Sequence, residues 1–206
     1  VETCPTWSPG GRYLYFCRTA PLPVERHREV RYDLMRISYD ADSQRWGEVE
    51  PVLLAKDTGL SIAEPRISPD GRWLLFCMSD YGEFPVFQPS SDLYLMDLKT
   101  RRHTRLDINS PRSESWHSWS GNSRWIVFAS KRRDGVFARL YFSYVDDQGR
   151  AGPRKRELRV VGRARVDLVG SRLADDWGFY FRIRIKDLPD IYHEVGRRGL
   201  RSALSY

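Results

Sequence analysis

The ionisable side chains of greatest chemical interest are one histidine and one glutamate. His117 is flanked by Trp116 and Trp119. Glu64 lies two residues before Arg66. An imidazole and a carboxylate could together line a polar channel mouth, and with the neighbouring indole rings could help to bind a partner or a small ligand. A purely structural explanation is also open, in which Glu64 faces solvent at the rim and His117 is hydrogen-bonded to a neighbouring loop. We treat both residues as candidates for binding.

Sequence signatures of catalysis are missing. The chain has no Gly-x-Ser-x-Gly elbow, no P-loop and no His-Glu-x-x-His motif. Cys4, Cys17 and Cys77 form no Cys-x-x-Cys pair, and the four histidines are scattered, so the sequence predicts neither a disulfide framework nor a zinc site. We therefore expect no catalytic residue, no cofactor and no metal in this chain.

Three stretches that contain these residues align without a gap. Residues 4–17, 64–77 and 116–129 read CPTWSPGGRYLYFC, EPRISPDGRWLLFC and WHSWSGNSRWIVFA. Each contains a tight-turn sequence at its centre, at residues 8–11, 68–71 and 120–123. In Ser-Pro-Asp-Gly of the second copy, Pro presets φ, Asp bonds its own backbone and Gly accepts a positive φ. In the third copy, Asn122 is the residue expected to take the left-handed conformation. Cys17 and Cys77 occupy one position of the repeat, which indicates a small apolar side chain there.

The segment after each turn has apolar side chains on both faces, as is typical of a strand packed between two layers. Further short strands and polar turns follow, so that each copy supplies about four strands, the content of one propeller blade. A two-layer sandwich is the alternative, but it does not require the same turn three times. The predicted strands cover 12–18, 72–78 and 124–130, then 32–37, 91–97 and 139–145, with outer strands at 50–55 and 103–106 in the first two copies only.

The repeat unit resembles the WD-like repeat of TolB-type β-propellers. The resemblance lies in Ile-Ser-Pro-Asp-Gly-Arg at 67–72 and Asp-Leu-Tyr-Leu-Met-Asp at 92–97, and the third copy looks like the last blades of such proteins. It covers residues 2–150. The family implies a six-bladed, exported ring that binds other proteins of the bacterial envelope in the periplasm. Because three blades are half of such a ring and the sequence begins at Val1, we expect a fragment of a longer protein or half of a ring that two chains close.

The composition changes near residue 153. The net charge of +7 is divided into +6 for residues 154–206 and +1 for the rest of the chain. Acidic residues are interspersed with the arginines and no stacking pattern of aromatics accompanies them, so we predict no nucleic-acid partner. No apolar run approaches the roughly 18–20 residues of a transmembrane helix. The predicted organisation is an all-β propeller with blades at 1–58, 59–110 and 111–152, followed by a divergent blade or cap at 153–206 that includes one or two strands over 177–185.

The predicted function is that of a non-catalytic scaffold that binds envelope proteins. One alternative is the propeller domain of a prolyl-oligopeptidase-like serine peptidase whose hydrolase domain is not in this chain. A propeller lyase is a second alternative, but it needs a cluster of metal-binding histidines, and His117 alone is too little. The candidate partner-binding residues are Tyr81, Phe84 and Phe87 in an aromatic loop, Glu64, Arg66, Trp116 and His117 near the inner strands, and Lys131, Arg132 and Arg133 in a basic turn.

Two of these candidate groups have a structural explanation as well. The aromatic loop, residues 81–89, offers the exposed rings that often anchor a partner, but its rings would equally pack across a blade. The basic turn would attract an acidic partner or simply face solvent.

Overall fold

The chain divides into two units, Val1–Leu158 and Arg159–Tyr206. In the second unit, β13 (Val166–Leu168) and β14 (Phe181–Ile183) pair as antiparallel strands. Apart from β14, the one or two strands predicted over 177–185 lie outside the described residues. The computed structural model describes residues 1–152, 156–157, 166–168 and 181–183.

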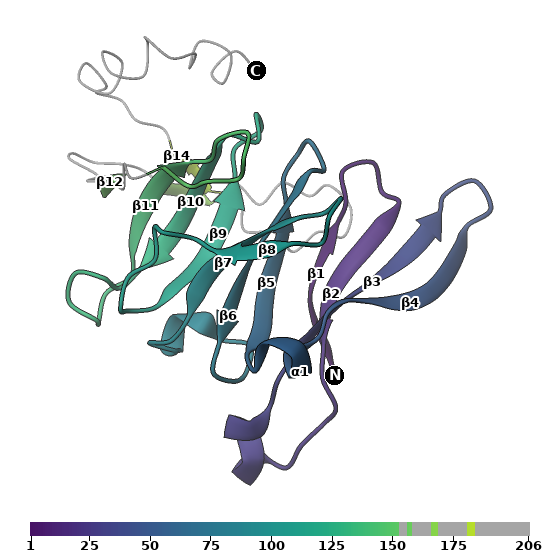
Figure 1. The fold of residues 1–206 in the computed structure, drawn as a ribbon, viewed down its shortest axis with the longest axis horizontal. Helices are drawn as coiled ribbons and strands as arrows, with labels where there is room; N and C mark the ends of the chain where they lie inside the picture. Colours follow the sequence, from purple (N-terminus) through teal and green to yellow (C-terminus); the bar gives the residue numbers. More distant parts are fainter. Residues whose placement is uncertain (153–155, 158–165, 169–180, 184–206) are drawn as a thin grey trace. The chain divides into compact units, whose positions relative to one another are not determined.

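The first unit is built from three antiparallel sheets that follow one another along the chain (Figure 1). Each sheet has four strands in sequence order, so each is a simple meander. They are three blades of a β-propeller, which confirms the predicted fold class. The strands are β1 (Glu2–Trp7), β2 (Tyr13–Arg18), β3 (Asp33–Asp40) and β4 (Arg45–Leu53) in blade 1, β5 (Ser61–Ile67), β6 (Trp73–Ser79), β7 (Asp92–Asp97) and β8 (His103–Arg105) in blade 2, and β9 (Glu114–Trp119), β10 (Trp125–Ser130), β11 (Arg139–Tyr144) and β12 (Arg156–Glu157) in blade 3.

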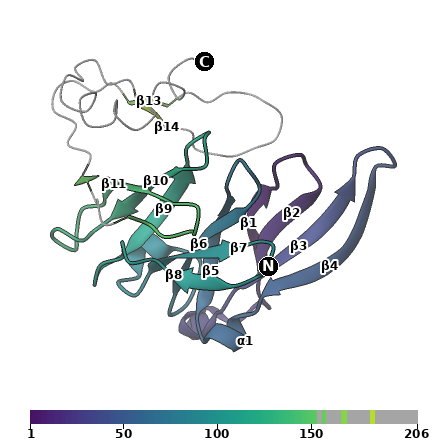
Figure 2. The ribbon, with the colours of Figure 1, turned by 45° about the horizontal axis from the view of Figure 1, so that its top comes forward.

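Short helices lie between some of these strands. They are a single-turn helix α1 (Ala55–Thr58) and two 3-10 helices at Val24–Glu29 and Pro85–Phe87. Among the described residues, no helix has the length and apolar character needed to cross a bilayer. The hairpin of β3 and β4 extends away from the other strands in both views of the ribbon (Figure 1, Figure 2).

Blade 3 has an outer strand that the sequence analysis did not predict. Strand β12 pairs with β11, with Glu157 opposite Tyr141 and Arg156 opposite Phe142. A strand of two residues is too short to display an alternation of apolar and polar side chains, so the sequence pattern does not reveal it.

The repeated serine closes the turn in every copy. The hydroxyls of Ser8, Ser68 and Ser120 accept hydrogen bonds from the backbone N–H of the first residue of the next strand, at 3.0, 2.9 and 3.0 Å. In the first two copies, Gly11 and Gly71 end the turn with φ of 71° and 73°. This glycine conformation is the one that the turn sequence predicts.

The prediction for the third turn was wrong in one residue. Ser123, not Asn122, has the positive φ, of 58°. The side-chain oxygen of Asn122 instead accepts hydrogen bonds from Ser120 Oγ at 2.7 Å and from the backbone N–H of Arg124 at 3.1 Å. Asp70 makes the same two contacts in the second copy, so Asn122 takes the place of an aspartate and Ser123 that of a glycine.

Two apolar layers hold the three blades together, and β6 contributes to both of them. Every residue of β6 is buried, as predicted for a strand with two apolar faces. Full burial of each large aliphatic or aromatic side chain contributes about 1.5–3 kcal/mol. The layer between blades 1 and 2 contains Cys17, Leu34, Ile62, Leu74, Phe76, Met78 and Met96, and the layer between blades 2 and 3 contains Leu75, Cys77, Leu93, Leu95, Ile126, Phe128 and Tyr141.

Candidate functional site

The inner strand of each blade carries a bulge at the same position of the repeat. The pairing register shifts there in β1, β5 and β9. Cys4, Glu64 and Trp116 occupy these positions with φ of 51°, 53° and 44°. A positive φ is uncommon for residues other than glycine, and a bulge changes the direction in which neighbouring side chains point. Because β5 contacts both β1 and β9, the bulges bring residues of adjacent blades together.

Glu64, Cys77 and His117 meet at these bulges, and we call them the inner-strand cluster. They come from β5, β6 and β9, and their donor atoms all lie within 4.8 Å of one another. Cys77 Sγ lies 3.6 Å from His117 Nδ1 and 3.8 Å from Glu64 Oε2. Glu64 Oε2 lies 3.9 Å from His117 Nδ1. The three side chains thus form a small triangle between blades 2 and 3.

Backbone groups hold the side chains of the cluster in place. His117 Nε2 lies 3.1 Å from the carbonyl oxygen of Leu75. Because a carbonyl only accepts, Nε2 carries the hydrogen and Nδ1 presents its lone pair to the cluster. Glu64 Oε2 accepts a hydrogen bond of 2.6 Å from the backbone N–H of Trp116. Both the imidazole and the carboxylate are therefore oriented toward Cys77.

Burial favours the neutral forms of the cluster. It lowers the pKa of His117 to about 3, with a further contribution from the positive charge of Arg66. It raises the pKa of Glu64 to about 7 and the pKa of the Cys77 thiol well above its ordinary value. As it stands, the cluster keeps its protons on sulfur and in part on the carboxyl, while the imidazole is uncharged.

A pair of thiols lies next to the cluster. A hydrogen bond from Cys17 lowers the pKa of the Cys4 thiol to about 6, and the backbone of Glu64 acts in the same direction. The pKa of Cys17 is raised by the same bond and by burial. All three cysteines of the chain are free thiols.

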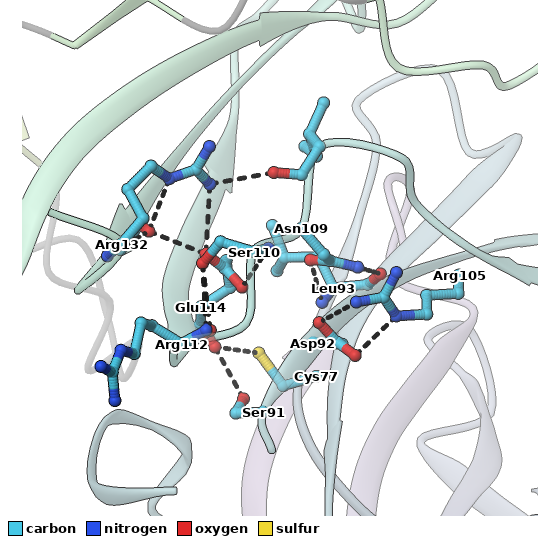
Figure 3. Close-up of polar contacts among 12 residues, drawn as sticks. Cys77, Ser91, Asp92, Leu93, Arg105, Asn109, Ser110, Arg112, Glu114 and Arg132 are labelled. Carbon is cyan, nitrogen blue, oxygen red and sulfur yellow. Dashed lines mark hydrogen bonds and ion pairs between the residues drawn. The ribbon is translucent and has the colours of Figure 1, made fainter. Parts of the chain in front are cut away.

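A second polar group surrounds the buried carboxylate of Glu114 (Figure 3). Its Oε1 accepts hydrogen bonds of 2.7 Å from the hydroxyls of Ser110 and Ser130, and its Oε2 one of 3.1 Å from the Ser110 N–H. Arg132 Nη2 lies 3.1 Å from Oε1, and the guanidinium stacks 4.3 Å from the Tyr141 ring centre. Burial raises the pKa of Glu114. This network fixes the segment before β9 to the one after β10.

Some of the predicted inner-strand residues lie in the interior and others lie at the surface. His117 is buried and Glu64 is half-buried. Trp116 is 58% exposed. The backbone carbonyl of Arg66 accepts a 3.1 Å hydrogen bond from the indole of Trp119. Cys77 joins Glu64 and His117, although the sequence analysis assigned it to packing alone.

The aromatic loop and the basic turn come together at one point of the surface. Phe84 and Phe87 are 61% and 74% exposed, whereas Tyr81 is half-buried. The ammonium group of Lys131 lies 5.6 Å from the Phe87 ring centre. Arg133 is exposed. We call Phe84, Phe87 and Lys131 the aromatic patch; Arg132 is not part of it, because its guanidinium pairs with Glu114.

No protein-family model and no curated protein matches the sequence of this chain. Among solved structures, puromycin hydrolase is similar with a TM-score of 0.50 and 18% identity, over 73% of this chain and 21% of that one. The β-propeller domain of the Trilobed protease from Pyrococcus furiosus has a TM-score of 0.45 and 14% identity, over 76% and 42%. The chain thus spans less than half the length of either structure. At these identities the likeness shows the fold, a partial β-propeller.

Proposed function

We propose that this chain is part of the propeller of a prolyl-oligopeptidase-like hydrolase and that the catalytic residues belong to a separate domain. The observation that supports this most is the similarity of its blades to puromycin hydrolase, at a TM-score of 0.50. The missing nucleophile elbow agrees with a non-catalytic role for residues 1–206. In this proposal the chain forms part of a wall that controls access to the active site.

The exposed end of blade 1 also supports a larger assembly. Leu14 and Phe16 are only half-buried, whereas Leu74 and Phe76 at the same repeat positions are completely buried against blade 1. A propeller normally covers such faces with further blades. The proposed hydrolase would supply those blades together with its catalytic domain.

The experiment is to express the protein from its complete gene and to label it with a fluorophosphonate, a probe that reacts with activated serines. We expect labelling of the complete protein and cleavage of short peptide substrates, with no labelling of residues 1–206 alone. Replacing the labelled serine with alanine should abolish both signals. The proposal would be overturned if the complete protein contained no nucleophile elbow and was not labelled by the probe.

The aromatic patch favours a second candidate, the TolB-like scaffold. In this proposal the chain works in the periplasm and binds an envelope protein through Phe84 and Phe87, two large apolar side chains that folding leaves exposed. Replacing both with Ser should weaken cross-linking to that partner without changing the circular dichroism spectrum. The matched control is Phe137→Ser, because Phe137 is 66% exposed in the loop between β10 and β11 and is not part of the patch. This candidate would be contradicted if the control weakened cross-linking equally, or if the Phe84/Phe87 variant no longer folded.

A further inference from the structure

The inner-strand cluster has the dimensions of three corners of a metal-binding tetrahedron. Zinc binds sulfur at about 2.3 Å and nitrogen or oxygen at about 2.0–2.2 Å, so tetrahedral ligand atoms lie about 3.3–3.6 Å from one another. The three separations in the cluster are 3.6, 3.8 and 3.9 Å. A contraction of at most about half an ångström, largest between His117 Nδ1 and Glu64 Oε2, would place all three donors at bonding distance from one ion.

The surroundings of the cluster are those of metal ligands. A histidine that binds a metal usually donates its other ring N–H to a carboxylate or carbonyl, which fixes the tautomer. His117 does this through Nε2 to Leu75, and its Nδ1 faces the cluster. Ligating carboxylates are likewise hydrogen-bonded, as Glu64 is by the N–H of Trp116. These contacts hold the two side chains in the orientation that coordination requires.

The donor types restrict which ion fits. Thiolate and imidazole ligands favour zinc and other late first-row transition metals, whereas calcium and magnesium prefer oxygen ligands. We propose that Glu64, Cys77 and His117 bind one zinc ion at the inner strands of blades 2 and 3. This site is independent of the proposed hydrolase function.

Zinc would change the charge state of the cluster. The ion binds the thiolate and carboxylate forms, so Cys77 loses its proton to solvent on binding, as does Glu64 where it is protonated. Two negative ligands would then balance the two positive charges of the ion in a place where few charges are tolerated.

The test uses the 206-residue chain, freed of metal with a chelator and titrated with Co²⁺ as a spectroscopic substitute for Zn²⁺. We expect one equivalent of Co²⁺ to bind, with a thiolate-to-cobalt charge-transfer band and the visible absorption of a tetrahedral ion. One equivalent of Zn²⁺ should remove both signals. It should also raise the thermal midpoint, because an ion that binds only the folded state stabilises it.

Two variants and one control identify the ligands. Cys77→Ser should eliminate the charge-transfer band. Glu64→Gln keeps an acceptor for the Trp116 N–H but should weaken Co²⁺ binding by at least about 10-fold, since even outer-shell changes have effects of 10–100-fold. Cys17→Ser is the matched control, a buried thiol at the same repeat position outside the cluster, and should retain the band.

Either of two results would overturn the proposal. One is the absence of stoichiometric Co²⁺ binding by the unaltered chain, which would show that the cluster is only a hydrogen-bonded packing group. The other is a charge-transfer band that persists in Cys77→Ser, which would assign the metal to Cys4 or Cys17. If Cys77→Ser does not fold, the unaltered chain and Glu64→Gln still decide the question.

Discussion

The carboxylate of Glu114 illustrates how one residue constrains its surroundings. A buried carboxylate is costly unless hydrogen-bond donors and a positive charge surround it. Ser110, before β9, and Arg132, after β10, supply such donors (Figure 3). Ser130, at the end of β10, supplies another. The run Lys-Arg-Arg at 131–133 gives no sign that its middle residue faces inward, so the sequence alone predicts a solvated or partner-binding turn there.

Removing Arg132 should therefore destabilise the fold strongly. Arg132→Ala leaves Glu114 buried without its counter-ion, and we expect the free energy of unfolding to fall by about 3–5 kcal/mol. The double variant Glu114→Gln/Arg132→Met should recover part of this loss, because it removes both charges. Urea unfolding followed by tryptophan fluorescence measures the differences.

A second arginine–carboxylate pair provides the control. Arg105 pairs with Asp92 at 2.6 Å, but its side chain is 51% exposed. Such surface pairs contribute about 0–1 kcal/mol, so Arg105→Ala should have a small effect. Equal destabilisation by the two alanine variants would show that burial of Glu114 does not govern the stability of its network.

The inner-strand cluster was predictable only in part. The alignment placed His117 and Glu64 near the inner strands, since both precede the repeated turn. Cys77 follows the turn, on another strand, and its repeat partners are a second cysteine and an alanine, so it resembles a packing residue. What joins the three is the pairing of β5 with β6 and the contact of β5 with β9, which no local spacing reveals.

At the scale of elements, the third turn departs from the other two in a way that a substitution can test. Gly121 stands where the other copies have Pro9 and Pro69, and its φ is not positive. Gly121→Pro should raise the free energy of unfolding by about 0.4–1 kcal/mol, because proline restricts the unfolded chain. Thermal unfolding measures the change.

Gly71→Ala is the control for this prediction, and we expect it to change stability in the opposite direction. Gly71 has φ of 73°, a conformation that costs a residue with a Cβ roughly 1–2 kcal/mol. We therefore expect destabilisation. A loss of stability in Gly121→Pro would show that the third turn does not share the backbone of the first two.

The central strands were the most predictable elements. Their turn sequences and alternating side chains locate β2, β6 and β10 to within one or two residues. The outer strands were less predictable, since β4 begins at Arg45, before the predicted 50–55, and β12 was missed. Outer strands are short or exposed, so burial imposes little pattern on their sequence.

At the scale of the molecule, blade 1 presents an incompletely covered apolar face. Leu14 pairs with Trp7 and Ile37, and Phe16 pairs with Met35, so these side chains share one side of the sheet. Trp7 is 39% exposed and the other four are half-buried. Because exposed apolar patches often mark interaction surfaces, we expect another sheet or chain to cover this face.

We predict that the isolated chain associates with itself or binds a hydrophobic dye through this face. Ile37→Lys should reduce dye binding and lower the weight-average sedimentation coefficient, because a charge on this face opposes its burial in a second chain. Val24→Lys, at an exposed position in a 3-10 helix, should change neither. A compact monomer with low dye binding in the unaltered chain would contradict the prediction, and with it the idea that two chains close one ring.

The complete burial of β6 has a consequence for the order in which the molecule opens. Blade 2 has a neighbour on each side, whereas blade 1 has an uncovered face, so local opening costs less free energy in blade 1. Repeat proteins lose structure through interfaces between neighbours, and the repeat with two interfaces is the last to open. The amide hydrogens of Leu74, Leu75 and Phe76 should therefore be the slowest in the described part of the chain to exchange with deuterium. Blade 2 would then be the last of the three blades to unfold.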